Sequence, residues 1–205
     1  PAGGASPYEL GGASVSISGR AAQLLYASAS RIDFVVPAEL AAGEHEVIVT
    51  SRDGTVSRGV VSVADVQPGI FTAAGTSEAL AMNAITFRGG GFEVTTPEAL
   101  GADKRTRVTI FATGISNLWN ADASNDVREG DRTRANVAES VVLAARASDG
   151  RALFLPVEFA GGSRTLRGLD QLTFLLPPEL RGAGAVQLTL WANARESNTV
   201  TITVR

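Results

Sequence analysis

The sequence contains no cysteine and only one histidine among its 205 residues. Without cysteine, the chain has no disulfides, no thiolate metal sites and no cysteine nucleophile. Long apolar runs are also missing, since no stretch approaches the ~18 residues of a membrane-spanning helix. The first ten residues show no basic start followed by an apolar segment, so we expect no signal peptide within this sequence.

Basic residues are few and scattered. Lys104 is the only lysine, and the formal net charge is -3 with a sequence pI of about 5.3. A nucleic-acid-binding protein is expected to carry a basic patch or stripe. None is apparent in this sequence, so we expect no nucleic-acid partner.

Alternation of apolar and polar residues dominates the chain, and helical patterns are scarce. In "ASVSISG" Val15 and Ile17 share one face, and in "NTVTITV" Val200, Ile202 and Val204 do the same. Such alternation is typical of strands with one buried and one solvated face. Short strands separated by turns such as "RDGT" and "SDGR" predict an all-β, antiparallel sandwich fold. We assign "QLLYA" and "SVVLAARAS" to strands as well, although their propensity also allows helix.

One segment of the sequence occurs twice. "RIDFVVPAEL" (31–40) and "QLTFLLPPEL" (171–180) both bring an alternating apolar strand to a proline. The surrounding strands match too: Val47 with Leu188, and Val61 with Ile202. Copies this far apart predict tandem domains rather than a short-period solenoid.

The first copy lacks a counterpart of the strand "RTRVTIFATG" that opens the second. We therefore predict a first domain at 1–66 with an incomplete first strand, and a second at 100–205. Between them, 67–99 is expected to form an ordered interdomain segment with a hairpin. An unpaired sheet edge is a liability, so we expect the 66–87 region or a neighbouring molecule to cover part of the first copy.

A family resemblance rests on motifs that follow one another along the chain. They are "LGGASVSISGRAAQLLYASASRIDFVVPAELAAG", "VQPGIF", "IFATGIS" and the terminal "SNTVTITV". The pattern resembles the IPT/TIG class of immunoglobulin-like domains. More closely, it is similar to an uncharacterised paired C-terminal module of large secreted proteins of soil acidobacteria of the Solibacter type. The resemblance implies two immunoglobulin-like domains without catalytic residues or cofactors, in a secreted or cell-surface bacterial protein.

Few residues suggest chemistry. His45 lies between Glu44 and Glu46, but in a regular strand those carboxylates point away from it, so no metal site or catalytic triad is predicted there. The acidic loop at 117–137 offers hard oxygen ligands suited to Ca²⁺, with Asp122, Asp126 and Asp131 as weak candidates. "FRGGGFE" precedes a strand rather than a helix, so we interpret it as a turn and not a phosphate loop.

The two tryptophans are the best candidates for contacts with a ligand or partner. Trp191 shares the polar face of its strand with Gln187 and Thr189, and Trp119 lies in the acidic loop. Exposed tryptophans can stack on sugars or anchor a partner, while a tryptophan that covers a domain interface is the plainer alternative.

We therefore expect a non-catalytic structural or adhesive module. Its partners would be other domains of the same polypeptide or extracellular molecules. The alternative is a carbohydrate-binding module attached to a secreted enzyme, with polysaccharide as its partner. An enzyme is not expected, although two distant carboxylates can meet in a fold, and that route stays open at this point.

Overall fold

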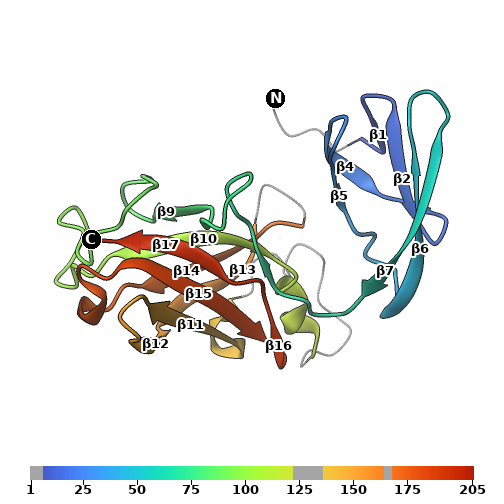
Figure 1. Ribbon diagram of the computed structural model, residues 1–205. Coiled ribbons are helices and arrows are strands. Elements are labelled where there is room, and N and C mark those ends of the chain that lie inside the picture. Colours follow the sequence, from blue (N-terminus) through green and yellow to red (C-terminus); the bar gives the residue numbers. More distant parts are fainter. Residues whose placement is uncertain (1–6, 122–135, 164–167) are drawn as a thin grey trace. The chain divides into compact units, whose positions relative to one another are not determined.

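Nearly all regular structure in the protein is β-strand. A computed structural model describes residues 7–121, 136–163 and 168–205 (Figure 1). Those ranges contain no α-helix, only the short 3-10 turns η1 (Ser116–Ala121), η2 (Ala138–Ser140) and η3 (Pro178–Leu180). Every pairing between named strands is antiparallel. The all-β antiparallel prediction is confirmed.

The chain divides into two compact units, 1–65 and 66–205. In the first unit one sheet has the order β1-β2-β6-β7, with β3 paired to β2, and β4 and β5 form a second sheet. "QLLYA" forms β4, as predicted. The strands of this unit are β1 (Glu9–Leu10), β2 (Ala13–Ile17), β3 (Arg20–Ala21), β4 (Gln23–Ala27), β5 (Ile32–Val35), β6 (Gly43–Thr50) and β7 (Val56–Val63).

The second unit contains two larger sheets. One has the order β13-β14-β10-β8 with β9 also paired to β10, and the other has the order β12-β11-β15-β16 with β17 paired to β15. "SVVLAARAS" supplies β11, again a strand as predicted. The strands are β8 (Gly69–Ile70), β9 (Ala81–Asn83), β10 (Arg107–Thr113), β11 (Val141–Ala147), β12 (Ala152–Leu155), β13 (Val157–Gly162), β14 (Asp170–Leu175), β15 (Gly184–Ala192), β16 (Arg195–Glu196) and β17 (Val200–Val204).

The core of the second unit lies between its two sheets. Alternate residues of each strand enter it, as the period-2 pattern predicts. Ile110 of β10, Phe174 of β14 and Leu188 of β15 are fully buried there. The outward residues of the same strands are more exposed, so each sheet has one buried face and one face toward solvent.

Segment 66–99 forms part of this second unit. Strands β8 and β9 pair with β10, whereas Phe92 bridges to Val204 of β17 in the other sheet. The two arms of the predicted hairpin therefore pair with strands of different sheets and not with each other. Val66, Ile70 and Phe92 are buried in the core of the unit. Apolar burial thus explains why this segment is ordered.

Gly114 shows why the motif "FATGIS" needs its glycine. Its φ is +76°, a conformation that L side chains rarely adopt. A Cβ at this position would collide with the backbone carbonyl of Gln67. The amide of Gln67 also donates a hydrogen bond to the Gly114 carbonyl at 3.1 Å. This close approach joins the start of the 66–99 segment to the end of β10.

The sequence repeat is also a repeat of strand register. Val47 pairs with Gly59 in β6 and β7, and Leu188 pairs with Val200 in β15 and β17. Leu188 follows Val47 by the same number of residues as Val200 follows Gly59. The β6–β7 and β15–β17 pairs therefore share one register. β2 lies on the other side of β6 just as β11 lies on the other side of β15. The strand matches that the repeat predicted therefore hold at the level of individual residue pairs.

Even an irregularity is repeated. The β4–β5 register shifts between Leu24 and Tyr26, leaving Leu25 as the extra residue. The β13–β14 register shifts between Val157 and Phe159, leaving Glu158. Such bulges bend a strand and redirect a side chain. By this correspondence, Phe34 of β5 matches Phe174 of β14, but β5 has no counterpart of β10 among residues 7–65.

Candidate functional site

The outer face of the β12-β11-β15-β16 sheet carries exposed apolar side chains. Trp191 of β15 is 40% exposed, Val142 of β11 is 46% exposed and Phe154 of β12 is 77% exposed. We call these three residues the aromatic patch. Trp191 thus lies on the outward face, as its parity with Gln187 and Thr189 predicted.

Strand register brings the members of the aromatic patch together. Val142 is directly opposite Trp191 in the β11–β15 ladder. Phe154 is opposite Ala144, the next outward residue of β11 after Val142. Directly opposite residues have Cβ atoms about 5 Å apart, and diagonal neighbours lie about 7–8 Å apart, within reach of aromatic side chains. The three side chains therefore form one continuous surface across three strands.

The sheet beneath the patch is rigidly supported. Leu143 and Leu190 alternate with the patch residues on β11 and β15 and are fully buried, and Leu155 follows Phe154 into the same core. Because dense packing of these inward side chains holds the strands in place, the backbone positions of the patch residues are fixed relative to one another. The patch is thus a preformed surface.

Polar side chains border the patch. Glu196 of β16 lies opposite Trp191, and the hydroxyls of Thr189 and Thr199 are 3.0 Å apart on the neighbouring row. Gln187 is exposed on the same face, one outward position further along β15. An apolar centre with a rim of hydrogen-bonding groups is the usual anatomy of a binding surface.

Sequence reasoning identified Trp191 but missed Val142 and Phe154. The parity signal was present, because both alternate with buried leucines. What sequence did not show was the strand order, which places β11 between β12 and β15. Only that order converts three isolated exposed residues into a patch.

The structure describes no side chain of the remaining tryptophan candidate or of the calcium-ligand candidates. Trp119 belongs to η1, but its side chain is not described. Asp122, Asp126 and Asp131 lie outside the described residues. Within the described ranges, no group of three or more His, Asp or Glu side chains is arranged to hold a metal ion.

His45 makes two side-chain hydrogen bonds, and neither partner is a carboxylate. Its Nδ1 is 2.9 Å from the hydroxyl of Ser18, and its Nε2 is 2.9 Å from the carbonyl of Ala41. Because a carbonyl can only accept, Nε2 donates the hydrogen bond to Ala41. Glu46 instead pairs with Arg58 at 2.8 Å. The histidine therefore links the β2–β3 turn to β6.

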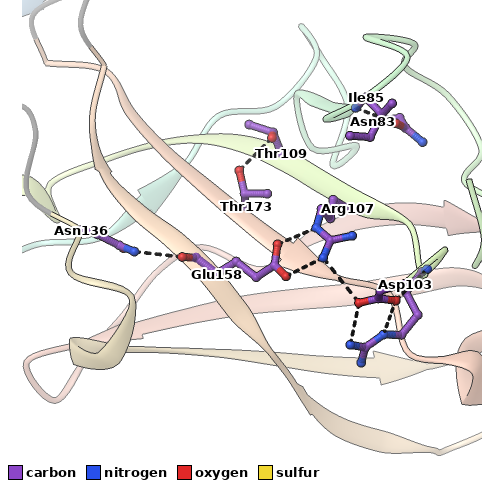
Figure 2. Close-up of polar contacts among 9 residues, drawn as sticks. Asn83, Ile85, Asp103, Arg107, Thr109, Asn136, Glu158 and Thr173 are labelled. Carbon is purple, nitrogen blue, oxygen red and sulfur yellow. Dashed lines mark hydrogen bonds and ion pairs between the residues drawn. The ribbon is translucent and has the colours of Figure 1, made fainter. Parts of the chain in front are cut away.

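A chain of ion pairs crosses the outer face of the other sheet. Arg107 of β10 donates two hydrogen bonds to Glu158, at 2.8 and 2.9 Å, and one to Asp103 at 3.4 Å (Figure 2). Asp103 also accepts two hydrogen bonds from the guanidinium of Arg105. These bonds, the Arg105 side-chain bond foremost, hold the pKa of Asp103 below its usual value. The charges satisfy one another, which indicates a structural network.

The bulge in β13 is what brings Glu158 to Arg107. Figure 2 shows the carboxylate reaching across to the guanidinium, while Asn136 donates to the Glu158 carbonyl at 2.9 Å. Both strands neighbour β14, so the pair spans its outer surface. Leu175 of β14, directly opposite Arg107, is only 5% exposed although it lies outward of the core. Long charged side chains often cover apolar neighbours in this way.

Asp170 is the most deeply buried acidic side chain in the described ranges. It is 2% exposed and accepts hydrogen bonds from the amides of Ile115 at 2.8 Å and Ser116 at 3.3 Å. Burial raises the pKa of Asp170, against the lowering effect of those bonds. This carboxylate fixes the start of η1 relative to β14.

Lys104 and Asn198 both bind to backbone groups of the second unit. Lys104 donates to the carbonyl oxygen of Ala99 at 2.5 Å, and Asn198 makes two hydrogen bonds to the backbone of Ile70. Gly91, within the "FRGGGFE" stretch, lies against the guanidinium of Arg205. These contacts hold the strands of the second unit together and contribute to its architecture.

No protein-family model, curated protein or solved structure matches the chain. Among the described residues, no helix is long and apolar enough to cross a membrane. By its geometry, the aromatic patch is the candidate functional site of the chain.

Proposed function

We propose that the chain is a non-catalytic pair of immunoglobulin-like domains with a structural or adhesive role. It would stand at the C-terminal end of a larger secreted or cell-surface bacterial protein. The observation that carries this proposal is the aromatic patch: three exposed apolar side chains on neighbouring strands of a sheet whose other face is buried.

The physical reason is the cost of exposing such a surface. Covering apolar surface lowers the free energy by roughly 25 cal/mol per Å². Scattered single apolar residues are common on protein surfaces, but contiguous patches mark interaction sites more often. Tryptophan and phenylalanine provide a large contact area with few rotatable bonds, so ordering them on binding costs little entropy.

The polar clusters of the described residues support a structural role. Arg105 and Arg107 neutralise Asp103 and Glu158, and the Ser18–His45 pair is completed by a carbonyl rather than a carboxylate. A general base in a triad needs an acidic partner on its second nitrogen to stabilise the imidazolium. These groups therefore stabilise the fold in our proposal, and the aromatic patch provides the contact with a partner.

Carbohydrate binding is the second candidate. It is favoured by one observation: Trp191 is flanked on the same face by the hydroxyls of Thr189 and Thr199 and by the exposed Gln187. A flat aromatic ring next to such groups can contact the apolar face of a sugar while the rim binds its hydroxyls. In this alternative the module would deliver a secreted enzyme to a polysaccharide.

Binding experiments with patch variants test the proposal. We would compare wild type, Trp191→Ala and Phe154→Ala for binding to bacterial surface extracts and to a panel of soluble polysaccharides. The control is Phe87→Asn, because Phe87 is also exposed, at 73%, but lies outside the patch. Asparagine suits the positive φ of 57° at that position.

We expect both patch variants to lose at least about tenfold in affinity, corresponding to ~1.4 kcal/mol, while the control binds as wild type does. Binding to a polysaccharide that depends on Trp191 would select the carbohydrate alternative. Equal binding by wild type and both patch variants would contradict a role for the aromatic patch under either hypothesis.

A further inference from the structure

The sheet face that carries the aromatic patch also carries an arginine without an ionic partner. Arg146 of β11 is exposed and lies opposite Gln187 of β15 on one side and Ala152 of β12 on the other. Within residues 7–121, 136–163 and 168–205, its side chain has no hydrogen-bond or ion-pair partner. Arg107, on the outer face of the other sheet, is by contrast neutralised by Glu158. The positive charge of Arg146 is therefore available to a ligand.

A small residue separates this charge from the aromatic side chains. Ala144 precedes Arg146 on the outward side of β11, and it lies opposite Thr189 of β15 and Phe154 of β12. Trp191 is the next outward residue after Thr189 on β15. Directly opposite residues lie about 5 Å apart and diagonal neighbours about 7–8 Å apart. A side chain as small as alanine covers little of these larger neighbours, so the aromatic, hydroxyl and guanidinium groups are accessible together.

We propose that this surface binds an acidic polysaccharide, with the carboxylate of a uronic acid against Arg146 and sugar rings on Trp191 and Phe154. A guanidinium presents planar, paired donors that match the two oxygens of a carboxylate. The apolar faces of sugar rings pack on aromatic side chains, while the Thr189 hydroxyl and the Gln187 amide can bind sugar hydroxyls. This inference rests on the aromatic patch as the contact surface proposed above, and it specifies the chemical class of the ligand.

The backbone beneath the patch favours a saccharide over an added peptide strand. β11 lies between β12 and β15, and β15 lies between β11 and β17 (Figure 1). Because ladders flank both strands, their backbone groups are paired within the sheet and not open to a further strand. The polar groups that this face offers come from side chains: a hydroxyl, an amide and a guanidinium. Those groups match a ligand rich in hydroxyls and carboxylates.

Strand spacing sets the length of the ligand. Trp191 and Phe154 lie on β15 and β12, with β11 between them. Neighbouring strands are about 4.8 Å apart, so the two aromatic residues are about 10 Å apart across the sheet. A single sugar ring is shorter than this distance, so only an oligosaccharide can contact both. Affinity should therefore rise from a monosaccharide to a trisaccharide.

Glu196, the acidic residue on the rim, lies at the opposite end of the surface from Arg146. It faces Trp191, which in turn faces Val142, four residues before Arg146 on β11. Two strand spacings and four residues correspond to about 10 Å across and about 13 Å along the sheet. This separation exceeds the screening length of about 8 Å at physiological salt, so Glu196 does not cancel the charge of Arg146. The uronate carboxylate is therefore placed at the Arg146 end.

Matched acidic and neutral trisaccharides test the proposal. The probes are the trisaccharides of galacturonate, mannuronate and guluronate, each compared with its methyl ester, in which every carboxylate is uncharged. Each is titrated calorimetrically into the full chain at low and at high salt. We expect at least one acid to bind about tenfold more tightly than its ester, because a charge-assisted pair with Arg146 forms only with the acid. This preference should shrink at high salt, and the monosaccharides should bind more weakly.

Three variants separate the charge from the aromatic contact. Arg146→Gln should lower the affinity for the acid to that for the ester and leave the ester unaffected. Trp191→Ala should weaken both ligands by the same factor, because ring packing does not depend on the carboxylate. The control is Arg88→Gln, since Arg88 is also exposed but follows β9 of the other sheet. This control should keep the full preference for the acid.

Two results would overturn the acidic-polysaccharide inference alone: no acid binds more tightly than its ester, or the preference persists in Arg146→Gln. The aromatic patch would still stand as a contact surface if Trp191→Ala loses binding to bacterial surface extracts. A preference for the acid that depends on Arg146 but is unaffected by Trp191→Ala would instead contradict both the inference and the role of the patch.

Discussion

The two units share strand register, but matched side chains are more deeply buried in the second unit than in the first. In the second unit Phe174 and Leu188 are fully enclosed, whereas their counterparts Phe34 and Val47 in the first unit are only partly covered. The difference lies in neighbours rather than in the strands themselves. The second unit has β10 and the segment 66–99 around its core, and residues 7–65 of the first unit contain no equivalent. Alternation therefore specifies which residues face inward, and the neighbouring strands determine how completely those residues are buried.

The largest expected effect is a difference between two equivalent phenylalanines. Phe174→Ala should destabilise the second unit by about 3–5 kcal/mol, because the substitution leaves a cavity in a packed core. Phe34→Ala should cost the first unit only about 1–2 kcal/mol, since a partly buried side chain loses less burial than a fully buried one. Guanidinium unfolding separates the two, as both tryptophans lie in the second unit and both tyrosines in the first.

Equal losses for the two substitutions would break the comparison. They would mean that Phe34 is as well enclosed in solution as Phe174.

The second expected effect concerns the segment that only the second unit has. Asn198 accepts a hydrogen bond from the Ile70 amide at 2.8 Å and donates one to its carbonyl at 2.9 Å. Asn198→Ala removes both and should cost roughly 1–2 kcal/mol. Hydrogen exchange at Ile70 should accelerate more than exchange at Leu188, because β8 would detach before the central sheet opens.

Asn198→Asp is the matched variant for this clamp. It keeps the acceptor for the Ile70 amide and loses the donor, so its effect should lie between those of wild type and alanine. Unchanged exchange at Ile70 in the alanine variant would show that burial of Val66 and Phe92 alone holds the segment, without a contribution from the amide.

Much of this architecture could be predicted from the sequence, for a physical reason. Alternation fixes strand faces locally, so β2, β5, β14 and β17 were recognised, and the repeat matched strands of the two units correctly. The strand partners of segment 66–99 are harder to predict from the sequence. The pairing of Phe92 with Val204 and of β9 with β10 depends on contacts between residues remote in sequence. The aromatic patch is predictable only in part for the same reason. Alternation along its strand predicts that Trp191 faces outward, but strand order determines which residues lie beside it.

The smallest expected effect is a pH dependence confined to the second unit. Asp170 is buried, and its counterpart in the first unit by strand register is Ser30, which cannot titrate. Burial raises the pKa of Asp170, so the folded state binds a proton more tightly than the unfolded state does. Its contribution to stability is therefore full below the unfolded pKa of about 3.9 and is lost as pH rises through the folded pKa.

Comparison with Asp170→Asn isolates this effect, because asparagine stays neutral. Tryptophan-monitored unfolding between pH 3 and pH 7 should show wild type losing stability relative to the variant as pH increases. Asp149→Asn gives the opposite sign: the Arg151 side chain lowers the pKa of Asp149, so wild type should gain stability relative to that variant as pH increases. A wild-type curve parallel to that of Asp170→Asn would show that the amides of Ile115 and Ser116 fully offset burial of the carboxylate.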